Sequence, residues 1–173
     1  MARVGYVDDT THPETAALAQ RIRAERGGKL LNLYKMLLNS PPLAEGWLKL
    51  FTAIRQQGIL SGRYRELAIL RVAVLNDAPY EFDAHVPFAL KEGTTEAQIA
   101  ALRQPVIGGD FDPVERAVLA YTDAMTREIR VSDALFDSLR PHFSDRELVE
   151  LTATVASYNL VSRFLEAIQI DHE

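Results

Sequence analysis

The sequence contains no cysteine, and this absence removes several kinds of chemistry at once. A chain without thiols has no disulfide framework, no cysteine nucleophile, no thiolate metal site and no thiol redox cycle. Tryptophan is scarce as well, with Trp47 as its single instance, and we assign it to the apolar core.

An excess of basic charge is also missing. Lysine and arginine number 19 against 24 aspartate and glutamate residues, which gives a net charge of −5 and makes nucleic acid a poor partner. The longest uncharged stretch, residues 151–162, has 12 residues, whereas a membrane span needs about 20. The first residues lack the apolar segment of a secretory signal. We therefore expect a cytoplasmic protein without nucleic-acid or membrane partners.

What the chain does have is ordinary globular composition, with 47% apolar and 25% charged residues over 173 positions. This length predicts one domain, residues 1–173, with its own apolar core. Helix signals divide the chain from its beginning. Thr11 or His12 precedes Pro13 at a predicted helix start, and the pair Gly27-Gly28 ends that helix.

The rest of the chain carries similar signals. Capping boxes join Thr95 to Gln98 and Ser144 to Glu147, and no segment alternates like a half-buried strand. We therefore expect an all-α, multihelical bundle of about eight helices. The predicted elements are helices over residues 29–39, 42–58, 61–76 and 79–92, helix starts at Thr95, Asp112 and Ser132, and a last helix over residues 146–170.

Two of the predicted helices are too apolar for a surface position. Every residue of 67–75 except Arg71 is apolar, and residues 151–161 contain only Thr, Ser, Tyr and Asn as polar types. Helices that are apolar all round lie in a core or in an oligomer contact. Polar groups inside such helices need partners, and we expect Arg71 to form an internal ion pair.

The first candidates for chemistry are Glu81 and His85, which are four residues apart in the helix predicted over 79–92. This spacing places both side chains on one helix face, with Tyr80 next to Glu81 in the chain. A carboxylate beside an imidazole orients the ring and raises its pKa, so that the ring can exchange a proton near neutral pH. The same spacing is common on solvated helix faces, and a structural pair is the alternative.

Two further polar groups lie in the apolar helices. Glu66 either relays protons with His85 or forms a structural bridge with an arginine. Arg163 follows Tyr158 and Asn159. It either clamps a carboxylate, which a guanidinium matches with two parallel hydrogen bonds, or forms an internal ion pair.

A metal ion and a cofactor are not expected. The other histidines are His12, His142 and His172, and none has the spacing of a partner ligand. The chain also lacks the glycine pattern of a nucleophile elbow and a phosphate-binding glycine loop.

The central part of the chain contains three motifs in order: Arg65-Glu66-Leu67-Ala68-Ile69-Leu70-Arg71-Val72-Ala73 followed by Asn76, then Tyr80-Glu81-Phe82-Asp83-Ala84-His85, then Ala89-x-x-x-Gly93. Together these motifs resemble the carboxymuconolactone decarboxylase family, which includes alkylhydroperoxidase D (AhpD) and its relatives. The likeness is strong over about residues 43–102. Residues 147–150 and 158–163 resemble the C-terminal half of longer members.

The peroxidase members of that family carry a Cys-x-x-Cys motif, a histidine four residues after its second cysteine, and a relay glutamate before its first. Counting back from His85 places the two cysteine positions at Ala78 and Glu81 and the relay position at Glu66. The acid/base half of the family's site is therefore retained and the redox half is missing. Because neither alanine nor glutamate forms a disulfide, thiol peroxidase activity by that mechanism is excluded.

The resemblance implies an AhpD-like helical fold and cofactor-independent acid/base chemistry. The reaction would be decarboxylation or isomerisation of a small carboxylic acid or lactone, the work of a lyase or isomerase. His85 would act as the acid/base group, with Glu81 as its orienting group or a second base, Glu66 as a relay and Tyr80 as a hydrogen-bond donor.

Arg163, Tyr158 and Asn159 would bind the substrate under the same resemblance, and the protein would form a homo-oligomer, a trimer or a hexamer. Two alternatives remain. One is a ligand-binding or structural family member without catalysis. The other is a peroxidase-related, peroxiredoxin-type protein that has lost its thiol redox activity.

Overall fold

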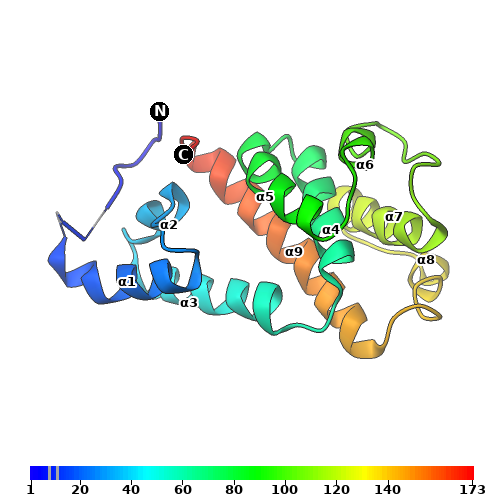
Figure 1. Cartoon of the computed structure of the whole chain (residues 1–173), viewed down its shortest axis with the longest axis horizontal. Coiled ribbons are helices and arrows are strands. Elements are labelled where there is room, and N and C mark those ends of the chain that lie inside the picture. Colours follow the sequence, from blue (N-terminus) through cyan, green and yellow to red (C-terminus); the bar gives the residue numbers. More distant parts are fainter. Residues whose placement is uncertain (8, 11) are drawn as a thin grey trace. The chain divides into compact units, whose positions relative to one another are not determined.

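The structure is a computed structural model that describes residues 1–7, 9–10 and 12–173. Within these residues all regular secondary structure is helical, which confirms the all-α prediction (Figure 1). The α-helices are α1 (Ala16–Glu25), α2 (Asn32–Leu37), α3 (Pro41–Thr52), α4 (Gly62–Leu75), α5 (Pro79–Lys91), α6 (Glu96–Ala101), α7 (Pro113–Glu128), α8 (Asp133–Asp137) and α9 (Asp145–Ile168). None of the described helices is both long enough and apolar enough to cross a bilayer.

The chain divides into two compact units. The first unit combines Met1–Gln57 with Leu165–Glu173, and the second is Gly58–Phe164. In the first unit α3 packs against α1 and α2. Trp47 is 6% exposed, and its ring stacks on Phe51 at 5.1 Å between centroids, which confirms its place in a core.

The second unit contains every residue that the sequence marks as a candidate for chemistry. Its central helix is α4, which packs against both α5 and α7. A helix covered on more than one side has no polar face, and this accounts for the apolar run in α4. Leu67 and Leu70 are fully buried there, and they join Phe82 of α5 and Leu119 of α7 in one apolar cluster.

Arg71 is the one charged residue in the apolar run of α4, and its side chain is fully buried. Its Nε and Nη2 donate to the two carboxylate oxygens of Asp123 on α7, at 2.6 and 2.7 Å. Its Nη1 donates to the carbonyl oxygens of Leu102 and Gln104, at 2.7 and 2.8 Å. The predicted internal ion pair is therefore present, and it holds the chain after α6 against α4 and α7.

Local capping signals set most helix boundaries. The capping box of Thr95 and Gln98 is present, and Ser144 and Glu147 exchange hydrogen bonds at the start of α9. Gly93 ends α5 with a φ of +88°, a conformation that glycine adopts without a steric penalty.

Other boundaries differ from the sequence expectation. In place of the single helix predicted over 42–58, the α-helix α3 ends at Thr52, and a π-helical segment, Ala53–Gln57, follows it. The helix predicted over 29–39 is shortened to α2. Of the two residues proposed to begin the first helix, Thr11 lies outside the described residues, and His12 precedes a short 3-10 turn, Pro13–Thr15.

Candidate active site

The centre of the site is His85, which contacts one carboxylate through each ring nitrogen. Its Nδ1 lies 2.6 Å from Oε2 of Glu66, and its Nε2 lies 3.0 Å from Oε1 of Glu81. The side chains of these three residues are between 2% and 7% exposed. Glu81 and His85 lie one turn apart on α5, as their spacing predicts, whereas Glu66 comes from α4.

Burial and the neighbouring negative charges shift the pKa of His85 in opposite directions. Burial disfavours the charged form, but the negative charge of Glu81, the hydrogen bonds to both carboxylates and the charge of Glu66 together outweigh it. The pKa of His85 is therefore raised above its ordinary value of 6.5. A charged imidazole has a proton on each nitrogen, so it donates to both carboxylates at once. The three side chains hold an exchangeable proton inside the protein near neutral pH.

The ring of His85 is enclosed by aromatic side chains. Tyr158 of α9 is buried and meets the ring edge-on, with centroids 5.1 Å apart. Phe88, three residues further along α5, lies 5.6 Å away between ring centroids and is 45% exposed. Tyr80 is buried in the first turn of α5. The structure therefore brings Glu66, Glu81, His85 and Tyr158 together.

Asn159 and Arg163 have different neighbours. Asn159 Nδ2 donates to Oγ1 of Thr126 at 3.0 Å, and its Oδ1 accepts from Asn76 Nδ2 at 3.0 Å, so that it links α9 to α7 and to the end of α4. Arg163 is exposed, and its Nη1 donates to Oδ1 of Asn159 at 2.7 Å and to its carbonyl oxygen at 3.1 Å. Among the described residues, no hydrogen bond or ion pair joins Arg163 to His85 or to its two carboxylates.

Arg65 and Phe88 contact this centre and were not singled out from the sequence. The Nε of Arg65 lies 3.3 Å from Oε1 of Glu66. An arginine directly before a buried glutamate was a visible signal, because the sequence had already suggested an arginine partner for Glu66. Phe88 had no such signal, since an aromatic residue in a helix is ordinarily a core residue.

The arrangement does not suit a metal ion. Glu66 and Glu81 bind opposite nitrogens of the ring, so the three side chains do not converge on one point, whereas a metal site needs convergent ligands. No group of three histidine, aspartate or glutamate side chains within the described ranges is placed to hold a metal.

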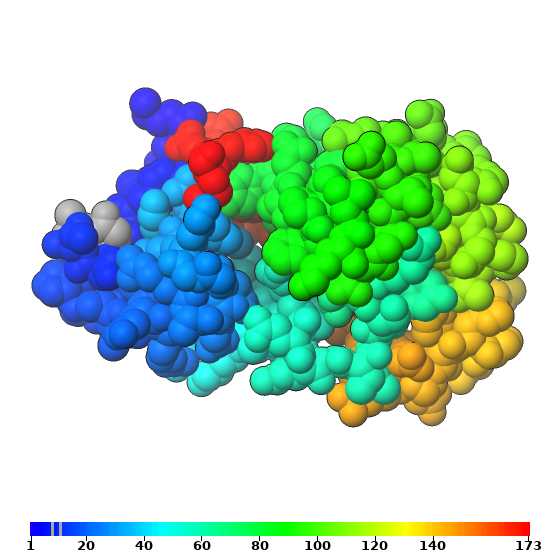
Figure 2. Space-filling model, in the orientation of Figure 1, coloured from blue at the N-terminus to red at the C-terminus, as the bar shows by residue number. Residues whose placement is uncertain are grey.

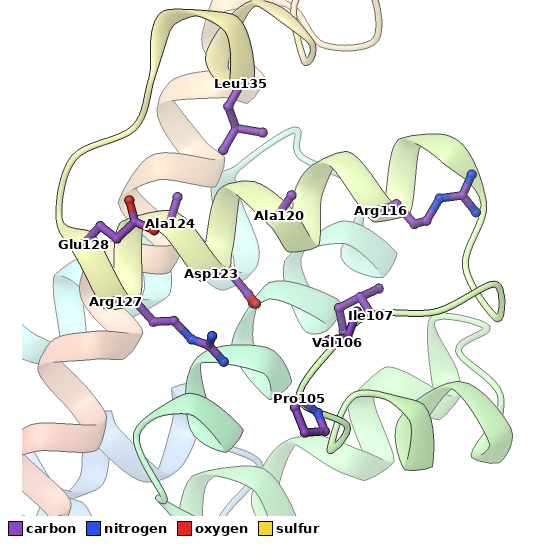
Figure 3. A pocket seen from close by; sticks show the side chains of 10 residues that line it. All are labelled: Pro105, Val106, Ile107, Arg116, Ala120, Asp123, Ala124, Arg127, Glu128 and Leu135. Carbon is purple, nitrogen blue, oxygen red and sulfur yellow. The ribbon is translucent and has the colours of Figure 1, made fainter.

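A pocket of about 500 Å³ lies elsewhere in the second unit (Figure 3). Ala120 and Ala124 of α7 lie along its centre, between Leu135 on one side and residues 105–107 on the other. The carboxylate of Asp123 also lines it, but Arg71 already neutralises that charge through two hydrogen bonds. None of the lining residues belongs to the His85 centre, so the volume of this pocket says nothing about the size of a reactant at His85.

The model of the carboxymuconolactone decarboxylase family matches residues 41–124, which include Glu66, Glu81 and His85. The uncharacterized protein YdfG of Bacillus subtilis (strain 168) is 28% identical over 110 residues, which make up 62% of this chain and 75% of YdfG.

Two solved structures share the fold. An uncharacterized peroxidase-related protein from Silicibacter sp. TM1040 has a TM-score of 0.84 at 18% identity, covering 99% of this chain and 92% of that one. A protein of unknown function from Agrobacterium tumefaciens, linked to the antioxidant defence protein AhpD, has a TM-score of 0.73 at 26% identity. The match covers 80% of this chain and 95% of that one.

Proposed function

Residues 41–124 of this chain belong to the carboxymuconolactone decarboxylase family, and from this premise we propose that the protein catalyses cofactor-independent proton transfer on a small carboxylic acid or lactone. The reaction is a decarboxylation or an isomerisation next to a carbonyl group. The observation that carries the proposal is the buried His85 with a buried carboxylate on each ring nitrogen.

Glu81 is the carboxylate that faces the reactant. Its Oε1 contacts Nε2 of His85, and its Oε2 has no partner among the described residues. Among the described residues, Thr94 Oγ1 is the one side-chain nitrogen or oxygen that is both shielded from solvent and without a hydrogen-bond partner. Because Oε2 of Glu81 also has no partner, it must be accessible to solvent. The free oxygen can accept a proton from a reactant or deliver one to it.

His85 and Glu66 support that exchange. In a decarboxylation, the bond to the departing CO₂ breaks and leaves its electron pair on the carbon next to the carbonyl. The Nε2 proton of His85 moves to Oε1 of Glu81, the carboxyl group turns over to present this proton to the reactant, and the carbon takes it up. Water then returns a proton to the ring through the same carboxyl group. Glu66 keeps Nδ1 protonated and holds the ring in position, as a second carboxylate does for many catalytic histidines.

An isomerisation uses the same groups in a different order. Glu81 removes a proton from the carbon beside the carbonyl, His85 balances the charge, and the proton returns to another carbon of the same molecule. Both reactions need neither a metal nor a redox cofactor, and this agrees with a centre built from two carboxylates and one imidazole.

Two alternatives differ from this proposal in what they require of His85. A non-catalytic member would use the cluster as an internal support, and the deep burial of all three side chains favours that alternative. A peroxidase-related protein is suggested by the relatives from Silicibacter and Agrobacterium. The chain has no cysteine, so a hydroperoxide assay with thiol donors should show no turnover above a heat-inactivated sample.

The test uses single substitutions of the two groups on α5. His85→Gln and Glu81→Gln should abolish CO₂ release, or deuterium uptake from D₂O, across a panel of lactone and keto acids. His142→Gln and Glu96→Gln serve as matched controls, because both side chains are exposed and lie outside the cluster. Circular dichroism and the melting temperature establish that each variant is folded. Full turnover in both α5 variants would assign the cluster to a structural role.

A further inference from the structure

Arg65 shares the carboxylate of Glu66 with the catalytic ring. Its Nε lies 3.3 Å from Oε1 of Glu66, while Oε2 of the same carboxylate contacts Nδ1 of His85 at 2.6 Å. The Arg65 side chain is 14% exposed. One carboxylate therefore separates a largely covered guanidinium from the imidazole.

The remaining donors of Arg65 have no acceptor among the described residues. A guanidinium has five N–H groups, and the contact with Glu66 occupies only the one on Nε. Both terminal NH₂ groups are left without a protein partner. A largely covered guanidinium usually has its donors paired within the protein, so these two groups are available to an acceptor that the chain does not supply.

Two neighbouring arginines of α4 show how this fold ordinarily treats a covered guanidinium. Arg71 uses all three of its nitrogens in hydrogen bonds. Arg63 is 30% exposed, twice as much as Arg65, and it also uses all three, on Glu115, Gly93 and Gln98. Arg65 is more covered than Arg63 and yet leaves two nitrogens unpaired.

Those two nitrogens are still accessible from outside the protein. Thr94 Oγ1 is the one side-chain nitrogen or oxygen of the described residues that is both shielded from solvent and without a partner. The terminal nitrogens of Arg65 have no partner, so they are accessible to solvent. The free oxygen of Glu81 is open by the same criterion. The centre therefore exposes an unpaired acceptor on one carboxylate and a planar pair of donors beside the other.

We infer that the terminal NH₂ groups of Arg65 bind the carboxylate of the reactant, which makes small monocarboxylates the substrate class of this site. The inference rests on the proposed function, since it places the carboxylate next to the proton-transfer group. A guanidinium edge binds a carboxylate through two parallel hydrogen bonds. Arg65 and His85 together carry two positive charges, which balance Glu66 and Glu81.

This assignment replaces Arg163 with Arg65 as the group that holds the substrate. Arg163 already donates to Asn159 on its own helix and is exposed. Arg65 is linked to the ring through a single carboxylate and has its bidentate edge unused. If Arg65 binds the carboxylate, its substitution weakens binding and substitution of Arg163 does not; if Arg163 binds it, the reverse holds.

The experiment measures binding of formate, acetate and benzoate, with benzamide as a neutral molecule of the same shape as benzoate. Saturation-transfer NMR gives the dissociation constants, and the ring-nitrogen shifts of His85 report whether the ligand lies beside it. The variants are Arg65→Gln and Arg65→Lys. Arg127→Gln serves as a control, because Arg127 is another arginine of the second unit that has no side-chain partner among the described residues but is exposed on α7 (Figure 3).

We expect at least one of the three carboxylates to bind the wild type and to shift the His85 signals, while benzamide binds at least about tenfold more weakly. Arg65→Gln should weaken that binding at least about tenfold, Arg65→Lys should weaken it less, and Arg127→Gln should leave it unchanged. Arg65 makes one long contact, so Arg65→Gln should melt at nearly the wild-type temperature. If Arg65→Gln is nevertheless unfolded, carboxylate binding by Arg65→Lys tests the inference.

Several results would overturn the inference: no binding of any of the three carboxylates, equal binding of benzamide, or unchanged binding in Arg65→Gln and Arg65→Lys. Loss of binding in an Arg163→Gln variant alone would assign the clamp to Arg163 instead. The proposed function fails by a different result. If His85→Gln keeps full turnover while carboxylate binding still depends on Arg65, the ligand site stands and the acid/base role of His85 does not.

Discussion

Glu66 Oε2 lies 2.6 Å from Nδ1 of His85, although 19 residues and a change of helix separate the two in the sequence. The contact joins α4 to α5 in the second unit. Burying a charged group is costly unless it is paired, and this pair is completed on the other side of the ring by Glu81. The free energy of unfolding therefore depends on whether His85 is protonated.

The first prediction concerns the pKa of His85. Both carboxylates raise it against the opposing effect of burial, so removal of either charge should lower it. We expect Glu81→Gln and Glu66→Gln each to shift the NMR titration of the His85 ring to lower pH. Glu96→Gln on α6 is the control and should leave the titration unchanged. An unchanged or raised pKa in both cluster variants would contradict the charged-ring description.

The second prediction concerns stability against pH. The folded-state pKa of His85 is raised above the ordinary value of 6.5, so folding favours the protonated ring. The resulting stabilisation is fully present below about pH 6.5. It is lost as the pH rises through the folded-state pKa, because the folded protein then gives up the proton that it had held more tightly.

Urea unfolding between pH 6 and pH 9 measures this loss, since the range spans the ordinary pKa of histidine and extends above it. The difference in free energy of unfolding between the wild type and His85→Gln should decrease as the pH rises. A difference that is constant or grows with pH would show that folding does not raise the pKa of His85.

The third prediction separates a buried ion pair from an exposed one. Arg71 is fully buried and binds Asp123 through two hydrogen bonds, so Arg71→Ala leaves a carboxylate and two carbonyl groups without their donor. We expect a loss of about 3–5 kcal/mol in the free energy of unfolding. Arg140 and Asp137 are 56% and 64% exposed, and Arg140→Ala should cost only about 0–1 kcal/mol. Similar losses in the two variants would contradict this ranking.

Sequence reasoning succeeded where one short segment contains the whole signal. The capping box of Thr95 and Gln98 and the four-residue spacing of Glu81 and His85 are local, so the start of α6 and the face shared by the pair follow from a few residues. The apolar run around Arg71 likewise required an internal partner. The identity of that partner, Asp123, depends on how α7 packs on α4, and no local pattern encodes it.

The candidate site shows the same division. The sequence offered Glu66 either a relay with His85 or a bridge to an arginine, and the structure contains both contacts, one on each oxygen. Tyr158 meets the His85 ring edge-on, whereas Arg163 turns back to Asn159 on its own helix. Spacing along a helix cannot tell which way a long side chain folds, because neighbouring acceptors on the same helix compete with a distant ligand.

The last prediction concerns self-association and comes from the outward face of α5. Ala84, Pro87 and Phe88 are exposed, and their spacing of three and four residues places them on one helix face. Figure 2 shows the green segment that includes α5 as a broad surface on the visible side. An exposed apolar helix face of this kind marks an interaction site, and a second copy of the chain would cover Phe88 beside the His85 ring.

We expect light scattering after size-exclusion chromatography to give the mass of a trimer or a hexamer for the wild type. Phe88→Glu should dissociate that oligomer, because a carboxylate buried in an apolar contact has no partner. Val106→Glu is the matched control, since Val106 is 79% exposed and lies on the loop before α7, outside the α5 face. A monomeric wild type, or dissociation by both substitutions alike, would exclude α5 as the contact between subunits.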